Sequence, residues 1–421
     1  MKRIPRHGEA VELQLGSDLR GIVAQVVALP GPPRYLVGGP VRDLLLGRSV
    51  EDLDFAVAGD VEGFGRALAG RLEGVLQTFA RFGTAKVMCL DGREVDLAAL
   101  RRETYRSPGA LPRVEPASLE EDLRRRDFSI NAMALELQPS GGAILHDPWG
   151  GAEDLAARRL RVLSRDSFRD DPTRLWRGVR FACRLGLRWA GETLARGQEA
   201  LAEGVMDRLS GRRQKVELRK LLEDPADPQD CLAEAARWGL LATVQERLPE
   251  ALDRTAGGAA LQRWQALTGE VRCWRVSLGV PMAALSEDQR RAVAERLALS
   301  RQERRCFGPA PTAEDWARMR PSQAHRLLAP LPEERRAVLW GLAGAAGRHH
   351  IDDLPRLEKL ASERLTGARL LAAGCPQGPH LGALLARTHG ALLDGEVSPR
   401  GQLKYALDLW RDTPSSSPSC G

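Results

Sequence analysis

Residues 35–60 constrain the fold of this chain of 421 residues more than any other stretch. The apolar run at residues 35–37 predicts a strand that ends at Gly38 and Gly39. Without Cβ atoms, these two residues let the chain turn sharply and let a ligand approach the backbone. The helix expected next points its first N–H groups back at the turn and carries Arg42 near its start. The stretch therefore predicts a phosphate-binding turn with an arginine beside it.

A second strand, expected at residues 52–57, carries two aspartates. Because side chains alternate along a strand, Asp52 and Asp54 should face the same way, roughly 7 Å apart. Two such carboxylates can hold two divalent ions about 4 Å apart, which suits in-line displacement at phosphorus. Asp96, on a strand expected nearby, can serve as a third carboxylate that takes a proton or shares a metal. The alternative for Asp96 is a solvated strand residue.

Two further stretches combine arginine with acidic and amide side chains. In RRRDFSINAMAL, Arg125 and Arg126 can bind triphosphate oxygens, and Asp127 and Asn131 can hydrogen-bond to ribose hydroxyls. The sequence FRDDPTR then predicts the start of a long helix with an aspartate cap. At 100° per residue, the arginines of this helix lie opposite its apolar face. These arginines are Arg174, Arg177 and Arg180.

In this order, the motifs resemble the nucleotidyltransferase superfamily that includes DNA polymerase β. LVGGPVRDLLLG with DLD is similar to the bacterial class II tRNA CCA-adding enzymes and poly(A) polymerases, and RRRDFSINAMAL matches the motif B of that family. In its base-reading motif, an Asp and an Arg pair with the edge of the incoming base. Asp171 and Arg174 match these two positions, and Asp170 stands where the family has Glu. The resemblance implies that Gly39, Arg42, Arg126, Arg177 and Arg180 bind the triphosphate.

The resemblance also implies an α+β fold with an N-terminal polymerase-β-like head followed by an all-helical neck, body and tail. The expected parts are a catalytic head at 1–148, a neck with the base-reading helix at 149–224, a body at 225–345 and a tRNA-binding tail at 346–421 that ends in disorder. The Pro-, Arg- and Glu-rich residues 101–122 are expected to form a mobile loop over the site.

Composition limits the setting in which the chain acts. A net charge of +6 suits a polyanionic partner, although the excess is modest for this length. The seven cysteines form no C-x-x-C pair, which favours a reducing compartment. No apolar run is long enough to span a membrane, and the basic start lacks the apolar stretch of a signal peptide. We therefore expect a cytoplasmic protein, and no motif indicates a protein partner.

The reaction that the resemblance implies is attack by the tRNA 3′-hydroxyl on the α-phosphate of CTP or ATP, with release of pyrophosphate. Asp52 and Asp54 would hold two Mg²⁺ ions. Enzymes that add only CC or only A share every motif quoted, and the sequence does not separate them from a full CCA-adding enzyme. Poly(A) polymerase is a further alternative within the class. A tRNA-binding protein with an inactive head is the alternative outside it, although both aspartates are present.

Overall fold

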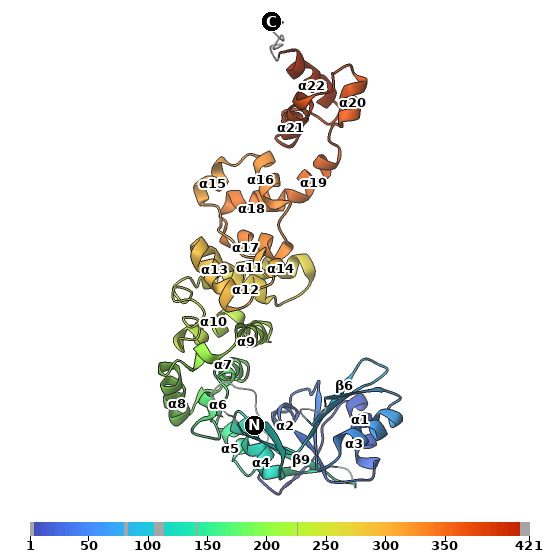
Figure 1. The fold of residues 1–421 in the computed structure, drawn as a ribbon, viewed down its shortest axis with the longest axis vertical. Coiled ribbons are helices and arrows are strands. Elements are labelled where there is room, and N and C mark those ends of the chain that lie inside the picture. The colour runs from blue at the N-terminus through green and yellow to red at the C-terminus, as the bar shows by residue number, and fades with distance from the viewer. Residues whose placement is uncertain (1–3, 80–82, 105–112, 140–141, 225, 413–421) are drawn as a thin grey trace. The chain divides into compact units, whose positions relative to one another are not determined.

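The computed structural model describes residues 4–79, 83–104, 113–139, 142–224 and 226–412. The chain divides into two compact units, Met1–Thr243 and Val244–Gly421. The first combines a sheet with helices, and the second is helical where it is described (Figure 1). The predicted α+β class, with a head followed by helices, is confirmed. The division into head, neck, body and tail stays a prediction, and residues 413–421 of the expected disordered end lie outside the described residues.

The first unit is built around a mixed sheet of eight described strands. In spatial order they are β1 (Ala10–Val11), β10 (Ala143–His146), β9 (Ala134–Leu137), β2 (Arg34–Val37), β3 (Leu53–Val57), β6 (Glu94–Ala99), β5 (Thr84–Met88) and β4 (Val75–Phe79). The pair β3 and β6 is parallel, and every other neighbouring pair is antiparallel. In β3, Leu53 and Phe55 are buried, whereas Asp54, on the opposite side of the strand, stays partly exposed. This alternation carries a carboxylate to the surface of an otherwise apolar strand.

Helices cover the sheet and continue the first unit. They are α1 (Ser17–Ala28), α2 (Gly39–Leu45), α3 (Val61–Arg71), α4 (Leu119–Arg124), α5 (Gly151–Ala156), α6 (Ser167–Asp170), α7 (Thr173–Leu185), α8 (Gly191–Ala202), α9 (Gly211–Glu223) and α10 (Pro228–Arg237), with short 3-10 turns at Ser129–Asn131 and Val205–Arg208 and a parallel pair β11 (Arg159–Leu160) and β12 (Arg188–Trp189). α7 is amphipathic and packs closely, because a Cβ on Gly178 would lie 2.1 Å from the ring of Trp189.

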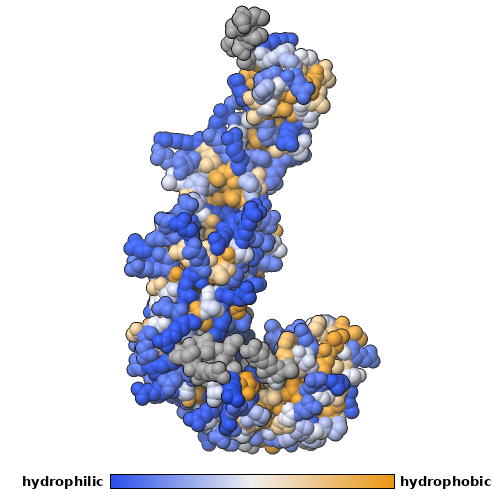
Figure 2. All heavy atoms as spheres, viewed as in Figure 1, coloured by the Kyte–Doolittle hydropathy of each residue, from blue (hydrophilic) through white to orange (hydrophobic). Residues whose placement is uncertain are grey.

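At the β5–β4 end of the sheet, Val75 and Met88 are exposed, and Figure 2 shows hydrophobic residues at the surface there.

The prediction that residues 101–122 form a mobile loop was wrong for much of the segment, because two strands and the start of a helix lie within it. β7 (Arg101–Thr104) pairs antiparallel with β8 (Arg113–Pro116), and α4 begins after the capping residue Ser118. Residues 105–112 lie outside the described residues. Charged side chains carry the strand pattern here: Arg102 on β7 donates to Glu115 on β8 at 2.9 and 3.0 Å. Hydrophobic periodicity could not reveal such a hairpin.

The second unit is described by itself as a series of helices around tryptophan-containing cores. They are α11 (Arg254–Thr268), α12 (Trp274–Ala284), α13 (Glu287–Arg296), α14 (Arg301–Arg304), α15 (Ala313–Arg318), α16 (Pro321–Leu328), α17 (Glu333–Leu342), α18 (Ala345–Asp352), α19 (Leu354–Ser362), α20 (Gly367–Ala372), α21 (Pro379–Leu393) and α22 (Gln402–Arg411). Trp264 and Trp316 are buried in separate clusters. None of the helices in the described part of the chain has the length and apolar character needed to cross a bilayer.

Candidate active site

One pocket of about 430 Å³ joins the segments that the sequence singled out. Its walls come from the glycine turn, β3, β7, residues 125–131 and α7. It is lined by Gly38, Gly39, Arg42, Asp54, Glu103, Arg125, Arg126, Asp127, Asn131, Asp171, Arg174, Arg177, Arg180, Phe181 and Arg184. This set contains every predicted site residue except Asp52 and Asp96. Seven arginines against four acidic residues make it a pocket suited to a polyanion such as a triphosphate.

The glycine turn allows an arginine to come close to the backbone. Gly38 has φ +74°, a conformation that side chains other than glycine rarely adopt, and a Cβ there would lie 2.9 Å from Nη1 of Arg126. Arg42 is almost fully buried and donates from Nη1 to Oδ1 of Asn131 at 2.7 Å and from Nε to Oδ1 of Asp43 at 3.0 Å. Arg42 therefore orients the amide of Asn131 at the edge of the pocket.

Asp54 and Asp96 lie near the starts of the neighbouring strands β3 and β6, and together with Asp52 they form what we call the carboxylate edge. Asp54 and Asp96 are direct partners across this parallel pair, and Nζ of Lys86 on β5 lies 3.5 Å from Oδ1 of Asp96. Burial, reinforced by the charges of Asp96 and Asp52, raises the pKa of Asp54 to about 6. Asp52 was expected inside the strand, but β3 begins at Leu53, and Asp52 is exposed just before it.

Asp52 lines a smaller pocket of about 170 Å³ next to the first one. Asp54 lines both pockets, as do Gly39, Arg42 and Arg184. The chemistry of Asp52 and Asp54 fits a divalent cation, because carboxylate oxygens are hard ligands and a cation would offset the burial and carboxylate repulsion that raise the pKa of Asp54. Among the described residues, no group of three or more His, Cys, Asp or Glu side chains forms a metal site. Asp96 is the neighbour of Asp54 across the β3–β6 pair.

The helix that FRDDPTR was expected to open begins just after Pro172, and a separate short helix precedes it. α6 ends at Asp170, Asp171 is extended, and α7 begins at Thr173. The break follows from competing hydrogen bonds, because Oδ1 of Asp171 accepts from the backbone N and the hydroxyl of Thr173 at 3.1 and 2.7 Å. The same oxygen accepts from Nη2 of Arg213 on α9 at 2.8 Å. Sequence reasoning did not single out Arg213.

The three predicted arginines of α7 differ in their surroundings. Arg174 was expected on the open face of the helix, but it is only 8% exposed. Arg177 donates from Nε and Nη2 to Oδ2 of Asp127 at 2.8 and 2.5 Å. Although burial acts to raise the pKa of Asp127, the charge of Arg177 and a hydrogen bond from Asn131 hold it at about 2. Burial lowers the pKa of Arg180, and its Nε has no hydrogen-bond partner among the described residues.

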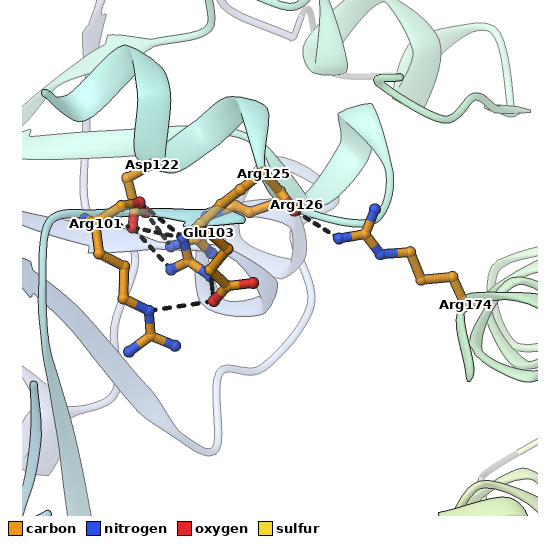
Figure 3. Close-up of polar contacts among 6 residues, drawn as sticks. All are labelled: Arg101, Glu103, Asp122, Arg125, Arg126 and Arg174. Carbon is orange, nitrogen blue, oxygen red and sulfur yellow. Dashed lines mark hydrogen bonds and ion pairs between the residues drawn. The ribbon is translucent and has the colours of Figure 1, made fainter. Parts of the chain in front are cut away.

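A network at the base of the β7–β8 hairpin holds the pocket wall (Figure 3). The buried Asp122 accepts from Nη2 of Arg125 at 2.7 Å and from Nη2 of Arg126 at 3.0 Å. Glu103 accepts from Nη1 of Arg125 at 2.7 Å. Nε of Arg126 has no partner among the described residues, which leaves this buried donor available to an anion.

Sequence reasoning missed three lining residues: Glu103, Phe181 and Arg184. Phe181 and Arg184 follow Arg177 and Arg180 by four residues, so helical spacing alone would have placed them on the same side of α7. Glu103 alternates with Arg102 on β7, a signal that the composition of the segment concealed.

Comparison with known proteins agrees with this geometry. A family model described as Poly A polymerase head domain matches residues 34–161. These residues contain the glycine turn, the carboxylate edge and the network around Arg125. The fold and the site therefore define a nucleotidyltransferase head, a class that generally uses divalent metal ions.

Two relatives extend the comparison beyond the head. An A-adding tRNA nucleotidyltransferase of Geobacter sulfurreducens is 34% identical over 406 residues, 90% of this chain and 45% of the relative. A CC-adding tRNA nucleotidyltransferase of Deinococcus radiodurans is 35% identical over 411 residues, 95% of this chain and 96% of the relative. The chain belongs to the tRNA nucleotidyltransferase family. It nevertheless spans less than half the length of the Geobacter relative.

Solved structures show the same fold. A CCA-adding enzyme in an apo form matches with a TM-score of 0.76 and 28% identity, covering 90% of this chain and 92% of that one. Other similar structures are complexes of CCA-adding enzymes with ATP, with CTP and with tRNA. The resemblance inferred from the sequence motifs is therefore confirmed.

Proposed function

We propose that this chain transfers C, A or both from CTP and ATP to the 3′ end of tRNA and releases pyrophosphate. The observation that carries the proposal is that Asp54 of β3 and the arginines of α7 line one pocket. Transfer to a hydroxyl needs a carboxylate edge for cations and a cationic wall for a triphosphate, side by side. The family and its solved complexes support tRNA as the acceptor.

The arginines that line the pocket, which we call the arginine wall, are assigned to the nucleotide. Arg126 and Arg180 have buried Nε groups that find no partner among the residues described. We assign both to triphosphate oxygens, together with Gly38, Gly39, Arg42 and Arg177. Asp171 and Arg174 are assigned to the base, because a carboxylate accepts from the exocyclic amine that C and A share. Asp127 and Asn131, already oriented by Arg177 and Arg42, are assigned to the ribose.

Asp52 and Asp54 are the residues that would hold Mg²⁺. When bound, the ion would lower the pKa of the tRNA 3′-hydroxyl and offset charge on the leaving pyrophosphate. The chain's own contribution is orientation: β3 fixes Asp54 in the wall that both pockets share, and Lys86 holds Asp96 beside it. Asp96 is assigned the acceptance of the hydroxyl proton.

The extent of addition is the open part of the proposal. Relatives of both the A-adding and the CC-adding kind match this chain, and the CC-adding relative matches it over nearly its whole length. CC-only addition is therefore the second candidate. The tRNA acceptor is consistent with a cytoplasmic setting.

Labelled CTP and ATP, separately and together, should be offered with Mg²⁺ to three tRNA transcripts, which end at the discriminator base, at C and at CC. Complete CCA on the first transcript identifies a full CCA-adding enzyme. Arrest at CC, or ATP incorporation only on the CC-ended transcript, identifies a partial enzyme. Long A tails would replace the proposal with poly(A) synthesis, and tRNA binding without any incorporation would refute it.

A further inference from the structure

Glu103 is the residue through which the β7–β8 hairpin reaches the nucleotide pocket. Its side chain is only 9% exposed and lines the pocket, although β7 pairs with β8 and not with the main sheet. Its Oε1 accepts from Nη1 of Arg125 at 2.7 Å and from Nε of Arg101 at 3.3 Å. A buried carboxylate with two arginine partners fixes the position of both guanidinium groups.

Arg125 is held on every nitrogen of its guanidinium group. Nε donates to the carbonyl of Arg101 and to Oδ1 of Asp122, both at 3.0 Å. Nη2 donates to Oδ1 of Asp122 at 2.7 Å, and Nη1 donates to Oε1 of Glu103, also at 2.7 Å. Although Arg125 was predicted to bind triphosphate, these contacts fit a residue that fixes the chain between α4 and the hairpin.

The backbone carbonyl of Arg125 connects this network to Arg174. It accepts from Nη2 of Arg174 at 2.7 Å, and Nη1 of Arg174 donates to Oγ of Ser167 at 2.6 Å. Figure 3 shows Arg174 reaching from α7 toward the network. Arg174 is 8% exposed and is held at both terminal nitrogens. A shift of the Arg125 carbonyl would therefore rotate the guanidinium group of Arg174 and the edge that it presents to the pocket.

We propose that Glu103 is a positioning residue for nucleotide selection: through Arg125 it fixes the carbonyl that orients Arg174. The proposal rests on the function proposed above, in which Arg174 contacts the base. Selection by hydrogen bonds depends on donor direction, so loss of the Glu103 contact should admit the wrong bases more readily. The same contact makes the hairpin a determinant of selectivity.

The test compares variants by the ratio of kcat/KM for the preferred nucleotide, CTP or ATP, to kcat/KM for UTP. Glu103→Ala should lower this ratio about tenfold, the effect of one misdirected polar contact. Glu103→Gln keeps an oxygen that can accept from Arg125, so it should stay within about threefold of wild type. Arg125→Lys, which cannot make the same set of contacts, should shift the ratio as Glu103→Ala does.

Glu115→Ala is the matched control. Glu115 lies on β8 of the same hairpin, accepts from Arg102 and is 37% exposed, but it does not line the pocket. Its loss should leave the nucleotide ratio unchanged. Thermal midpoints and tRNA affinity of all variants check that the fold persists. If Glu103→Ala does not fold, Arg125→Lys and Glu103→Gln decide the question.

An unchanged ratio in folded Glu103→Ala or Arg125→Lys would overturn the inference. Equal gains with all nucleotides in Glu103→Ala and Glu103→Gln would also overturn it, because Glu103 would then act only by repelling phosphate. Failure of the proposed function is a different result: wild type would incorporate no nucleotide, and no ratio could be measured.

Discussion

The two walls of the active-site pocket, the arginine wall and the carboxylate edge, differ in how their charged groups are paired. On the arginine wall, Arg177 is paired with Asp127, and Arg125 is paired with Asp122 and Glu103. At the carboxylate edge, Asp54 lies opposite Asp96 across the β3–β6 pair, and burial together with the charges of Asp96 and Asp52 raises its pKa to about 6. Carboxylates thus fix the direction of the Arg125 and Arg177 guanidinium groups, whereas burial and neighbouring carboxylates disfavour the ionised form of Asp54.

This difference separates orientation from electrostatic attraction. A tied guanidinium group presents a fixed donor edge to a base or ribose at little entropic cost on binding. Repelling carboxylates instead store an unfavourable interaction that a divalent cation relieves. Substitutions on the arginine wall should therefore affect stability and selectivity, and those at the carboxylate edge should affect turnover and cation affinity.

The largest effect is expected from Asp52→Ala combined with Asp54→Ala. Loss of both carboxylates should lower nucleotide incorporation by at least about 10³-fold, because electrostatic stabilisation of the transition state is removed. Binding of tRNA, measured by filter retention, should persist. Unchanged incorporation in this folded double variant would show that the carboxylate edge is not the catalytic wall.

A smaller effect, on stability, is expected from Arg177→Met. It leaves the carboxylate of Asp127, which is 5% exposed, without its charged partner, at a cost of about 2 kcal/mol after allowance for the partial exposure of Arg177. The pKa of Asp127 is depressed to about 2, so its contribution is present above the ordinary value of 3.8 and is lost as the pH falls through 2. The deficit, measured by urea denaturation, should therefore shrink below pH 4.

Arg66→Met is the control for this prediction. Arg66 pairs with Glu62 one helical turn away, and both side chains are more than half exposed. Its loss should cost no more than about 0.5 kcal/mol. Equal costs in the two variants at pH 7 would show that the Arg177 pair contributes no more than a surface pair.

The affinity of the carboxylate edge for Mg²⁺ should depend on pH. The pKa of Asp54 is raised, so this carboxyl is protonated below pH 6 in the cation-free protein. Each unit below pH 6 should weaken Mg²⁺ binding by up to about tenfold, because the cation must displace the proton. Calorimetric titration between pH 5 and 8 measures this, and constant affinity across that range would contradict it.

The same raised pKa predicts the opposite trend in stability. Folding favours the neutral form of Asp54, so in the absence of divalent ions its ionisation costs stability as the pH rises from 3.8 through 6. Asp54→Asn should therefore be more stable than wild type at pH 8, and the gain should vanish near pH 4. Thermal midpoints in a chelating buffer measure the difference.

The sequence predicted which residues reach the pocket better than it predicted their contacts: every predicted arginine lines the pocket, whereas Asp52 precedes β3 and neither Asp52 nor Asp96 lines it. Strand alternation and the Gly38–Gly39 turn are local rules, and they were enough to place Asp54, Arg42 and the glycines together. The network that orients Arg174 depends on the carbonyl of Arg125 and on a hairpin whose pattern is carried by charged side chains. Neither a backbone acceptor nor a charged strand leaves a hydrophobic period in the sequence.

Phe181 illustrates what helical spacing could still have revealed, and it gives the smallest predicted effect. The guanidinium carbons of Arg42, Arg177 and Arg180 lie 5.3, 5.9 and 5.2 Å from the centre of its ring. Phe181→Leu should raise KM for the nucleotide about two- to fivefold with little change in kcat. The three arginines keep their charges and their other contacts, so the expected net loss is that of one cation–π contact, about 0.5–1 kcal/mol, and the carboxylate edge is untouched.

Phe64→Leu is the matched control, because the ring of Phe64 lies 6.0 Å from Arg34 and does not line the pocket. It should leave KM unchanged while causing a similar loss of packing. If Phe181→Leu lowered kcat and left KM unchanged, the ring would act on the carboxylate edge, and the separation between the two walls would be lost. A rise in KM confined to Phe181→Leu would instead show that an apolar ring helps to hold the arginine wall in place.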